Sequence, residues 1–377
     1  MAYTKNAPFR ADVVGSYLRP AELKAARADF EAGRIDAAAL KATEDRAIAD
    51  LIAKQKAAGL RVITDGEFRR GWWHLDCMWG FAGVAKVTMD KGYVFHDEET
   101  RAESARLTGP IAFDGTHPFV DHFRFVKGFE DDTVVARQTI PSPAQLYAEL
   151  FRPENIGSVH EFYGETQADY DRLADDTADA FHGLIMALYG AGCRNVQLDD
   201  CTWGMFCDPA FNGHYSPEAF QAMQEQYAAM NNKAIEGLPA DLVVTTHDCR
   251  GNYHSTWASS GGYATVADVL FGKENVAAYY LEFDDDRSGD FAPLAKVSGD
   301  KKVVLGLITS KKPELEDPEV IKARIAEAAE IVPLERLCLS TQCGFASTEE
   351  GNKLTEEQQW AKIALVRSIA KDVWGED

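Results

Sequence analysis

The sequence predicts an α/β fold, a single (β/α)8 TIM barrel, and three observations carry this prediction. Eight short runs rich in β-branched residues recur along the 377-residue chain, and stretches of helix-forming composition separate most of them. Several runs are apolar on both faces, as expected for strands buried between helices. Strands that alternate with helices along one chain are typical of a parallel sheet, and eight of them suffice to close a barrel.

The predicted strands and helices follow one another in chain order. The strand candidates are residues 11–16, 60–67, 133–140, 193–200, 242–249, 276–283, 302–309 and 336–341. Residues 21–58 are rich in Ala, Glu, Lys and Arg, and the sequence between the third strand and Tyr189 is also helix-like. Residues 315–331 and 355–371 combine helix composition with the apolar spacing of an amphipathic helix. Asp317 followed by proline marks the start of the first of these.

Residues 72–132 interrupt the alternation. They are rich in Trp, Phe, His and Asp and contain strand-like pieces at 84–88 and 93–95. We expect this excursion after the second strand to cover the active-site end of the barrel, in part as an antiparallel extension. Without an internal repeat or low-complexity tract, the chain is predicted to form one domain over residues 1–377. A doubly wound open sheet is the alternative, but the G-x-G-x-x-G and Walker patterns that usually accompany it are absent from the sequence.

Composition excludes several classes of partner. The net charge is −21, from 39 basic and 60 acidic residues, which argues against nucleic acid or an anionic membrane as a partner. No stretch approaches the length of a membrane span, and the N-terminus lacks the apolar core of a signal peptide. Seven cysteines without a regular spacing favour reduced thiols, some of them available to a metal. We therefore expect a cytoplasmic protein that acts on a small molecule.

The predicted strands end in residues that carry chemistry. In such barrels the active site lies at the carboxyl ends of the strands. The polar residues and cysteines there are Gly15-Ser16, Asp65-Gly66-Glu67, Asp199-Asp200, His247-Asp248-Cys249, Glu282, Thr309-Ser310 and Cys343. Because alternate residues of a strand point the same way, His247 and Cys249 should project side by side.

An imidazole, a carboxylate and two thiolates form a ligand set suited to zinc. His247, Cys249, Glu282 and Cys343 would supply it from three strand ends. Two of these residues have an alternative role: Cys249 as a small buried apolar residue, and Glu282 as part of the acidic loop that continues with Asp284. Cys343 lies between an apolar strand and a glycine, which favours exposure over burial. Cys77, Cys193 and Cys338 are better candidates for core cysteines.

This ligand set favours one kind of chemistry. Zinc holds a substrate thiol as the nucleophilic thiolate, and two protein thiolates with a carboxylate leave electron density on that sulfur. A hydrolytic zinc is better served by neutral imidazoles. Glu67 and Asp199 are placed to grip an ammonium group, and Gly15 and Ser16 to offer donors to a carboxylate. An N-cap or a loop hydrogen bond is the competing role for both acids.

Seven segments resemble the catalytic, C-terminal barrel of cobalamin-independent methionine synthase. They are Val14-Gly-Ser16 with Arg19-Pro20, Thr64-Asp-Gly-Glu-Phe-Arg-Arg70, Leu107-Thr-Gly-Pro110, Val196-Gln-Leu-Asp-Asp200, His247-Asp-Cys249, Leu281-Glu282 and Gln342-Cys-Gly344, in the order of that family over nearly the whole chain. The resemblance implies a zinc ion bound by His247, Cys249, Glu282 and Cys343. It also implies an amino-acid thiol whose amino group binds Glu67 and Asp199 and whose carboxylate binds Gly15 and Ser16. Methionine synthesis from homocysteine and a methyl-folate is the implied activity.

The chain departs from that family on the side of the methyl donor. Cys201 and Thr202 follow Asp199-Asp200 where the family has Asp-Glu-Pro-Ala. Thr309 and Ser310 replace a histidine that protonates the leaving folate. The family's pterin-stacking tryptophan is missing after Pro110, and Phe113 and Phe119 are the nearest aromatic residues. A thiol alkyltransferase with another donor, such as a corrinoid protein or a methylated sulfur or nitrogen compound, is therefore the second prediction.

Two other classes of function fit the sequence less well. A zinc hydrolase would carry several histidines at strand ends, and only His247 lies there. A non-catalytic binding protein would not need a metal open to substrate. Trp72, Trp73, Trp79 and Trp203 are expected to pack loops over the barrel mouth rather than stack on a donor, and the spacing of His74, His117 and His122 singles out none of them as a proton donor.

Overall fold

The computed structural model describes residues 6–375, in which helices separate most of the parallel strands. The strands are β1 (Val62–Ile63), β2 (Ala82–Thr88), β3 (Glu103–Ala112), β4 (Val135–Ala136), β5 (Gln138–Pro141), β6 (Asn195–Asp200), β7 (Val243–Asp248), β8 (Ala278–Glu282), β9 (Lys302–Ile308) and β10 (Leu337–Thr341). The α-helices are α1 (Ala21–Glu31), α2 (Ala37–Ala57), α3 (Leu75–Met78), α4 (Pro118–Lys127), α5 (Pro143–Leu150), α6 (Ile156–Phe162), α7 (Gln167–Gly190), α8 (Thr202–Cys207), α9 (Pro209–Asn212), α10 (Pro217–Ile235), α11 (Ala267–Lys273), α12 (Pro318–Ala329) and α13 (Glu356–Trp374).

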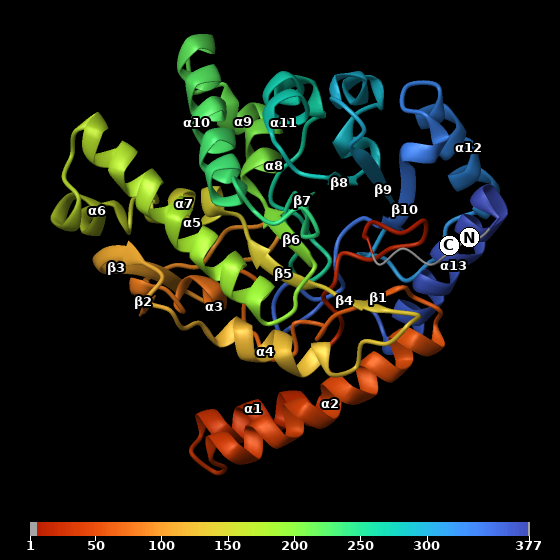
Figure 1. Cartoon of the computed structure of the whole chain (residues 1–377), viewed down its shortest axis with the longest axis horizontal. Helices are drawn as coiled ribbons and strands as arrows, with labels where there is room; N and C mark the ends of the chain where they lie inside the picture. The colour runs from red at the N-terminus through yellow and green to blue at the C-terminus, as the bar shows by residue number, and fades with distance from the viewer. Residues whose placement is uncertain (1–5, 376–377) are drawn as a thin grey trace.

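The strands form an α/β fold whose largest sheet is parallel. Its order is β10-β9-β8-β7-β6-β5, so neighbours in this sheet are also neighbours along the chain. β1 pairs in parallel with β4, which only Arg137 separates from β5. At the other edge, Ala11 forms a parallel bridge with Leu339 of β10. Figure 1 shows these strands in the centre with helices around them. Seven of the eight predicted strand positions contain a strand, whereas residues 11–16 contribute only the bridge at Ala11.

The first and second extended segments are joined by hydrogen bonds rather than by a ladder within residues 6–375. The Tyr17 amide donates to the Gly66 carbonyl over 3.1 Å, and the Thr64 hydroxyl donates to the Gly15 carbonyl over 2.7 Å. The main sheet is therefore extended on both sides but is not closed by strand pairing. These contacts bring the carboxyl ends of the first two segments together.

A buried ion pair lies among the parallel strands. Arg137 donates to Asp12 over 3.0 Å, to the Tyr280 hydroxyl over 2.7 Å and to Gln197 over 3.2 Å. Gln197 in turn donates to Asp199 over 2.8 Å. The side chains of Arg137 and Asp12 are both fully buried. This polar layer therefore connects the first segment to β6 and β8 just below the strand ends.

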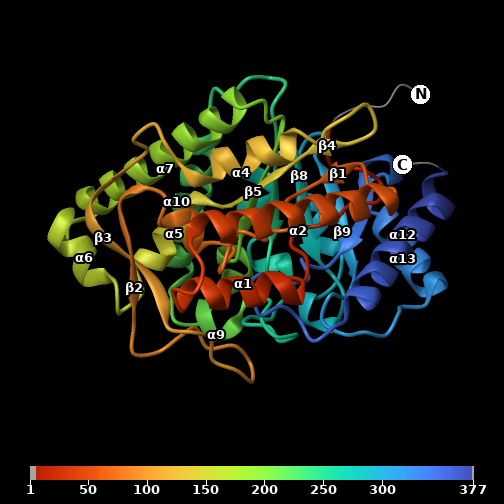
Figure 2. The same cartoon turned by 90° about the horizontal axis from the view of Figure 1, so that it is seen from below.

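Apolar helix faces cover the strands. α12 and α13 coincide with the two helices predicted near the C-terminus, and each begins at a side-chain cap, Asp317 and Thr355. α1 and α2 are two helices within the single region predicted at 21–58, and Figure 2 shows them lying side by side across one face. The turn between them ends at Asp36, whose carboxylate caps α2. No helix among the described residues is long and apolar enough to cross a membrane.

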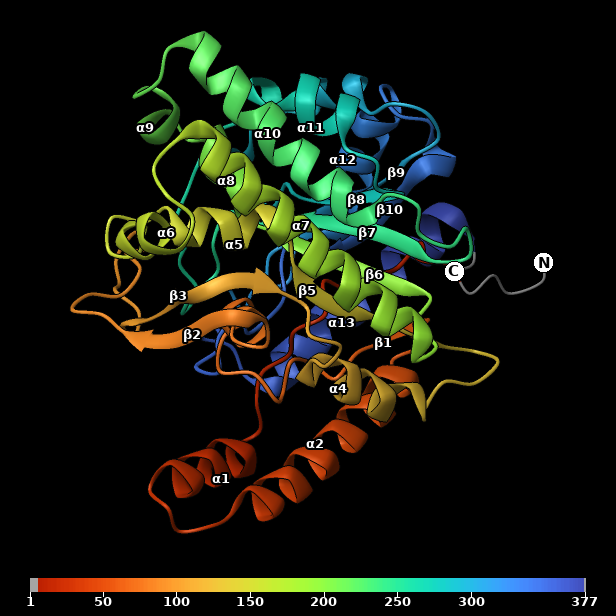
Figure 3. The ribbon, with the colours of Figure 1, turned by 60° about the vertical axis from the view of Figure 1, so that its left-hand side comes forward.

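The excursion at 72–132 contains an antiparallel pair. β2 pairs with β3, and Figure 3 shows this pair beside α5 and α6, outside the central strands. The segment between the two strands reaches the loops that follow β7 and β10. The His96 amide donates to the Trp257 carbonyl over 2.9 Å, and Glu98 accepts hydrogen bonds from His254 and Lys353 over 2.7 and 2.6 Å. Residues 95–98 therefore tie these two loops together.

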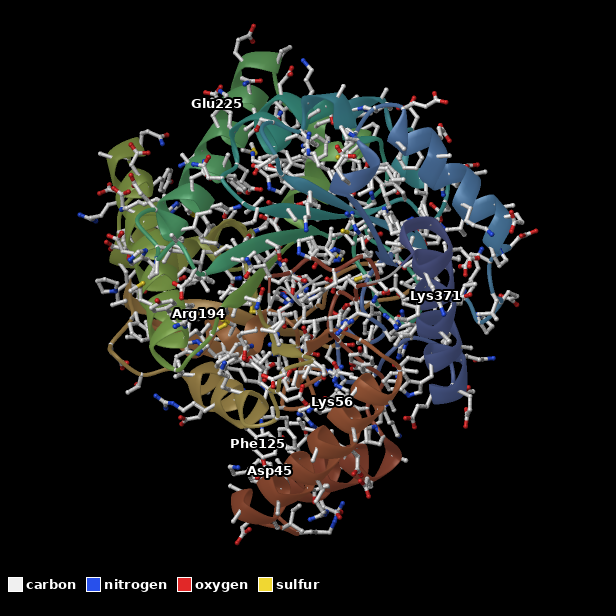
Figure 4. All side chains as sticks on the ribbon, turned by 45° about the vertical axis from the view of Figure 1, so that its right-hand side comes forward. Asp45, Lys56, Phe125, Arg194, Glu225 and Lys371 are labelled. Atoms are coloured by element: carbon white, nitrogen blue, oxygen red, sulfur yellow. The ribbon has the colours of Figure 1, made fainter. Side chains whose placement is uncertain are left out.

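The surface carries the excess of acidic charge. Figure 4 shows the charged side chains spread over the outside, among them Asp45, Arg194 and Glu225. Several of the described ion pairs are exposed, such as Arg194–Asp241 at 2.7 Å. Pairs of this kind contribute little to stability.

Candidate active site

Four side chains from three strand ends converge in the structure. One ligand atom each from His247, Cys249, Glu282 and Cys343 lies within 4.8 Å of all the others. His247 is in β7 and Cys249 follows it directly, Glu282 ends β8, and Cys343 lies two residues beyond β10. All four side chains are buried. The exposure predicted for Cys343 is wrong: the residue is 3% exposed, and its sulfur contacts Cys249 over 3.7 Å and Ser347 over 4.0 Å.

The orientation of these side chains leaves metal-ligand atoms free. The His247 Nδ1 lies 3.1 Å from the Tyr280 carbonyl, a contact that makes Nδ1 the protonated nitrogen. Its Nε2 is buried without a hydrogen-bond partner, as is Oε2 of Glu282. The other oxygen of Glu282 accepts from the Arg250 amide over 2.9 Å. A histidine that donates one N–H to a carbonyl and presents the other nitrogen is typical of metal sites.

The charges in this cluster also fit a cation. The Cys249 and Cys343 sulfur atoms are 3.7 Å apart. The hydrogen bond from Cys249, followed by burial, raises the pKa of the Cys343 thiol well above its usual range. Burial lowers the pKa of His247, but the neighbouring Cys343 and Glu282 raise it, so that the net shift is upward. A bound cation would reverse the thiol shift by stabilising both thiolates. The residues present therefore fit a divalent metal with sulfur, nitrogen and oxygen ligands.

Two predicted carboxylates lie beside the cluster. Glu67 and Asp199 line the same cavity as His247, Cys249 and Cys343. Glu67 accepts hydrogen bonds from Thr139 over 3.0 Å and pairs with Arg70 over 3.2 Å, while its Oε2 has no partner. Burial, followed by the charge of Glu67, raises the pKa of Asp199 well above its usual range. A cationic group between the two carboxylates would offset their mutual repulsion and lower the pKa of Asp199.

The cavity is narrow, with a volume of about 20 Å³. Its lining residues are Val14, Ser16, Glu67, Trp73, Asp199, His247, Cys249, Cys343, Gly344 and Ser347. Ser16 is the predicted carboxylate-binding residue, and its hydroxyl accepts from the Ala346 amide over 3.3 Å. Gly15 precedes it with φ of 131°, a conformation that suits glycine. Six of the eight residues predicted to bind metal or substrate therefore line this cavity. Of the other two, Glu282 belongs to the four-residue cluster and Gly15 precedes Ser16.

The loops of this site have a strained backbone at Glu67 and are held together by the Arg19 side chain. Glu67 has φ of 62° and follows Gly66 at 67°, so two consecutive residues adopt the left-handed conformation that is costly for glutamate. The Arg19 guanidinium is buried and donates to the carbonyls of Glu67 over 2.7 Å and Ala346 over 2.5 Å. Arg19 also donates to the Tyr17 and Arg70 carbonyls. One side chain thus joins three strand-end loops.

Some residues of the site were not recognised from the sequence. Arg70 and Arg19 lay within matching segments, but their spacing gave no role. Ser347, four residues after Cys343, carried no signal at all. Trp73 lines the cavity although it was expected to pack a loop, whereas Trp203 is fully buried as expected.

The three histidines of the excursion do not line the cavity. His74 lies 3.2 Å from the Tyr93 hydroxyl, and burial lowers its pKa to about 3. His117 contacts the Cys77 carbonyl over 3.0 Å, and burial lowers its pKa to about 4. Burial likewise lowers the pKa of His122 to about 4. All three are neutral at physiological pH, which makes them poor acids for a leaving group.

Comparison with known proteins agrees with the architecture. The model of the family described as "Cobalamin-independent synthase, Catalytic domain" matches residues 9–75 and 162–371. The "Uncharacterized protein YxjG" of Bacillus subtilis (strain 168) is 45% identical over 98% of this chain and 96% of its own. A structure from Listeria monocytogenes, provisionally assigned as a vitamin B12-independent methionine synthase, has a TM-score of 0.78 at 42% identity, covering 99% of this chain and 100% of its own.

A third protein shares the fold at lower identity. It is a B12-independent methionine synthase from Shewanella sp. W3-18-1, solved in complex with selenomethionine. Its TM-score is 0.69 at 18% identity, over 98% of each chain.

Proposed function

Because the chain belongs to the family of the cobalamin-independent synthase catalytic domain, we propose that it transfers a methyl group to the thiol of homocysteine or a similar amino-acid thiol. Methionine synthesis from a methyl-folate is the activity implied by the family resemblance. The observation that carries the proposal is the convergence of His247, Cys249, Glu282 and Cys343 within 4.8 Å. These four residues would hold a zinc ion, which supplies the substrate thiol as a nucleophilic thiolate at neutral pH.

The remaining residues of the cavity bind and orient the amino acid. Glu67 and Asp199 bind its ammonium group between them. Oε2 of Glu67 has no hydrogen-bond partner, and a neighbouring cation would stabilise the charged form of Asp199. Ser16 and the Gly15 backbone receive the carboxylate on the opposite side. Arg70 keeps Glu67 in place through the ion pair and through its bonds to Thr139. With both ends of the amino acid fixed, its sulfur points to the cluster and attacks the donor methyl in line.

The surrounding chain excludes water from this attack. Trp73 forms part of the cavity wall, and residues 95–98 of the excursion connect the loops after β7 and β10. We propose that the excursion covers the active-site end of a closed (β/α)8 barrel that forms one domain. The eight extended segments in chain order and the Tyr17–Gly66 hydrogen bond support closure. Since the proposed site needs two reduced thiols, we place the protein in a reducing compartment such as the cytoplasm.

The test combines metal content with product analysis. Protein purified without chelator should hold about one zinc ion per chain and convert homocysteine to methionine with a methyl donor. Cys343→Ser should lose zinc and activity, whereas Cys338→Ala, a matched control in the buried strand β10, should keep both. Absence of zinc from the wild-type protein, or full metal content in Cys343→Ser, would refute the proposal.

The end of β9 favours a second candidate for the donor. Ser310 there donates its hydroxyl to Gln342 over 3.0 Å, and Thr309 accepts from the Lys311 amide. Neither hydroxyl is an acid strong enough to protonate a leaving folate at neutral pH. A corrinoid or a methylated sulfur or nitrogen compound is therefore the alternative donor. Homocysteine with a panel of donors, read by mass spectrometry, separates the two, because useful turnover with methyl-folate would exclude the alternative.

A further inference from the structure

A third thiol lies beside the four-residue cluster. Cys201 follows β6 directly, as Cys249 follows the neighbouring strand β7. The two strands are parallel, with Asp200 opposite Asp248 as the last pair in register. The Cys249 amide donates to the Asp200 carbonyl over 2.9 Å, a bond of this last pair, and Cys201 and Cys249 are the next residue on each strand. Cys201, with φ of −91° and ψ of −6°, already turns into α8. Cys201 and Cys249 are thereby placed next to each other.

This placement meets the geometric requirement of a disulfide. Neighbouring strands lie about 4.8 Å apart, and bridged cysteines have Cα atoms about 4.4–6.8 Å apart. The two thiols also interact with each other: their mutual hydrogen bond is the largest influence on the pKa of each. A bond between the sulfur atoms therefore needs a side-chain rotation and little movement of the backbone.

The three thiols of the site differ in access to solvent. Cys249 and Cys343 are 6% and 3% exposed, whereas Cys201 is half-buried. Cys201 is also outside the group of four converging ligand atoms. Cys201 is therefore the most exposed of the three cysteines, and Cys249 is its hydrogen-bonded thiol partner.

We propose that Cys201 and Cys249 form a reversible disulfide when the protein meets a hydroperoxide. The peroxide transfers one oxygen to Cys201, giving a sulfenic acid and releasing water or an alcohol. The Cys249 sulfur then attacks the Cys201 sulfur, forming the S–S bond and expelling the hydroxyl group as water. Two thiols lose two electrons in total, and the O–O bond of the peroxide takes them up. A dithiol reductant reverses the change.

The disulfide removes one of the four converging ligands. A metal held by His247, Glu282 and Cys343 alone loses a thiolate and is released more readily. Meanwhile the Cys249 sulfur is protected from oxidation to the irreversible sulfinic acid. The loss of methyl transfer on oxidation rests on the proposed function, but formation of the bond does not.

Peptide mapping distinguishes the possible disulfides. Cleavage after Lys and Arg places Cys201 and Cys207 on residues 195–233, Cys249 on residues 234–250, and Cys338 and Cys343 on residues 337–353. The zinc-loaded full chain is treated with hydrogen peroxide, alkylated and digested without reduction. We expect a linked pair of 195–233 and 234–250, release of zinc to a chromogenic chelator, and recovery of both after dithiothreitol and added zinc.

Two variants assign the bond and its effect. Cys201→Ala should abolish the linked pair and keep its zinc at the peroxide dose that empties the wild-type protein. Cys207→Ala, the matched control on the same peptide, should behave as the wild type. Linkage of 234–250 to 337–353 instead, no linkage at all, or equal zinc loss and recovery in Cys201→Ala would overturn the inference. If the untreated protein binds no zinc, the proposed function fails, while the linked pair still tests the disulfide.

Discussion

Replacement of Arg137 by Met tests how far the site depends on the ion pair among the strands. Arg137 and Asp12 are fully buried and 3.0 Å apart, and the guanidinium also bonds the Val13 carbonyl over 2.8 Å and the Tyr280 hydroxyl over 2.7 Å. Met fills a similar volume but offers no donor. The substitution therefore leaves the Asp12 carboxylate buried without its countercharge.

The expected cost follows from this geometry. Removing one partner of a buried ion pair destabilises a protein by about 3–5 kcal/mol. Asp12 keeps its bonds from the Phe9 and Val13 amides, at 2.9 and 2.7 Å, so the lower end of that range applies. In Arg137→Met/Asp12→Asn no charge remains, and we expect the double variant to be more stable than the sum of the two single costs by about 2 kcal/mol.

Urea unfolding at fixed pH, followed by circular dichroism and intrinsic fluorescence, measures these differences. The matched control is Arg194→Met, which breaks the exposed pair with Asp241 (Figure 4) and should cost about 1 kcal/mol or less. A cost for Arg137→Met no larger than that of Arg194→Met, or strictly additive single costs in the double variant, would refute the reasoning.

Three further predictions concern the substrate pocket and the excursion. Glu67→Gln should raise KM for the amino-acid thiol roughly ten- to a hundredfold, since a charged hydrogen bond contributes about 1.5–3 kcal/mol, with zinc content unchanged by metal analysis; an unchanged KM would remove Glu67 from ammonium binding. A Cβ at Gly344 would lie 1.9 Å from the Ser16 hydroxyl oxygen, so Gly344→Ala should displace Ser16 and raise KM in steady-state assays, whereas Gly157→Ala, with open space around it, should not. Burial lowers the pKa of His117 from 6.5 to about 4. Between pH 6.5 and 4 the unfolded chain therefore binds a proton at this histidine that the folded chain does not bind. This histidine therefore contributes stability that is complete above pH 6.5 and falls by about 3 kcal/mol as pH decreases to 4. His117→Asn, which retains an N-cap for α4, should flatten the urea midpoint between pH 6.5 and 4 relative to the wild type, and an equally steep profile would contradict this.

The fold was predictable because its signals are local. Each parallel strand is buried on both faces, so a short β-branched run marks it without any knowledge of its neighbours, as residues 302–309 do for β9. The two C-terminal helices were likewise marked by their apolar period and by a cap. The weaker signals lay at the first two segments, which are joined by hydrogen bonds from Tyr17 and Thr64 rather than by a ladder.

The candidate site was predictable to the extent that strand ends determine it. His247 and Cys249 follow from the two-residue period of a strand, and Glu282 follows from its place after an apolar run. The burial of Cys343 did not follow, because it depends on contacts with Cys249 from another strand end and with Ser347. Residues such as Ser347, Arg19 and Trp73 reach the cavity through contacts between distant loops, and no local pattern encodes such contacts.

The ion pair of Glu67 outweighs the strain of its backbone. A glutamate in the left-handed conformation costs about 1–2 kcal/mol relative to its relaxed form, and glycine would remove that cost. Glu67→Gly would also leave the buried Arg70 guanidinium without its carboxylate partner, which costs about 3–5 kcal/mol. A library screened only for heat resistance should therefore retain Glu67, so that selection for stability also preserves the carboxylate that the proposed substrate needs.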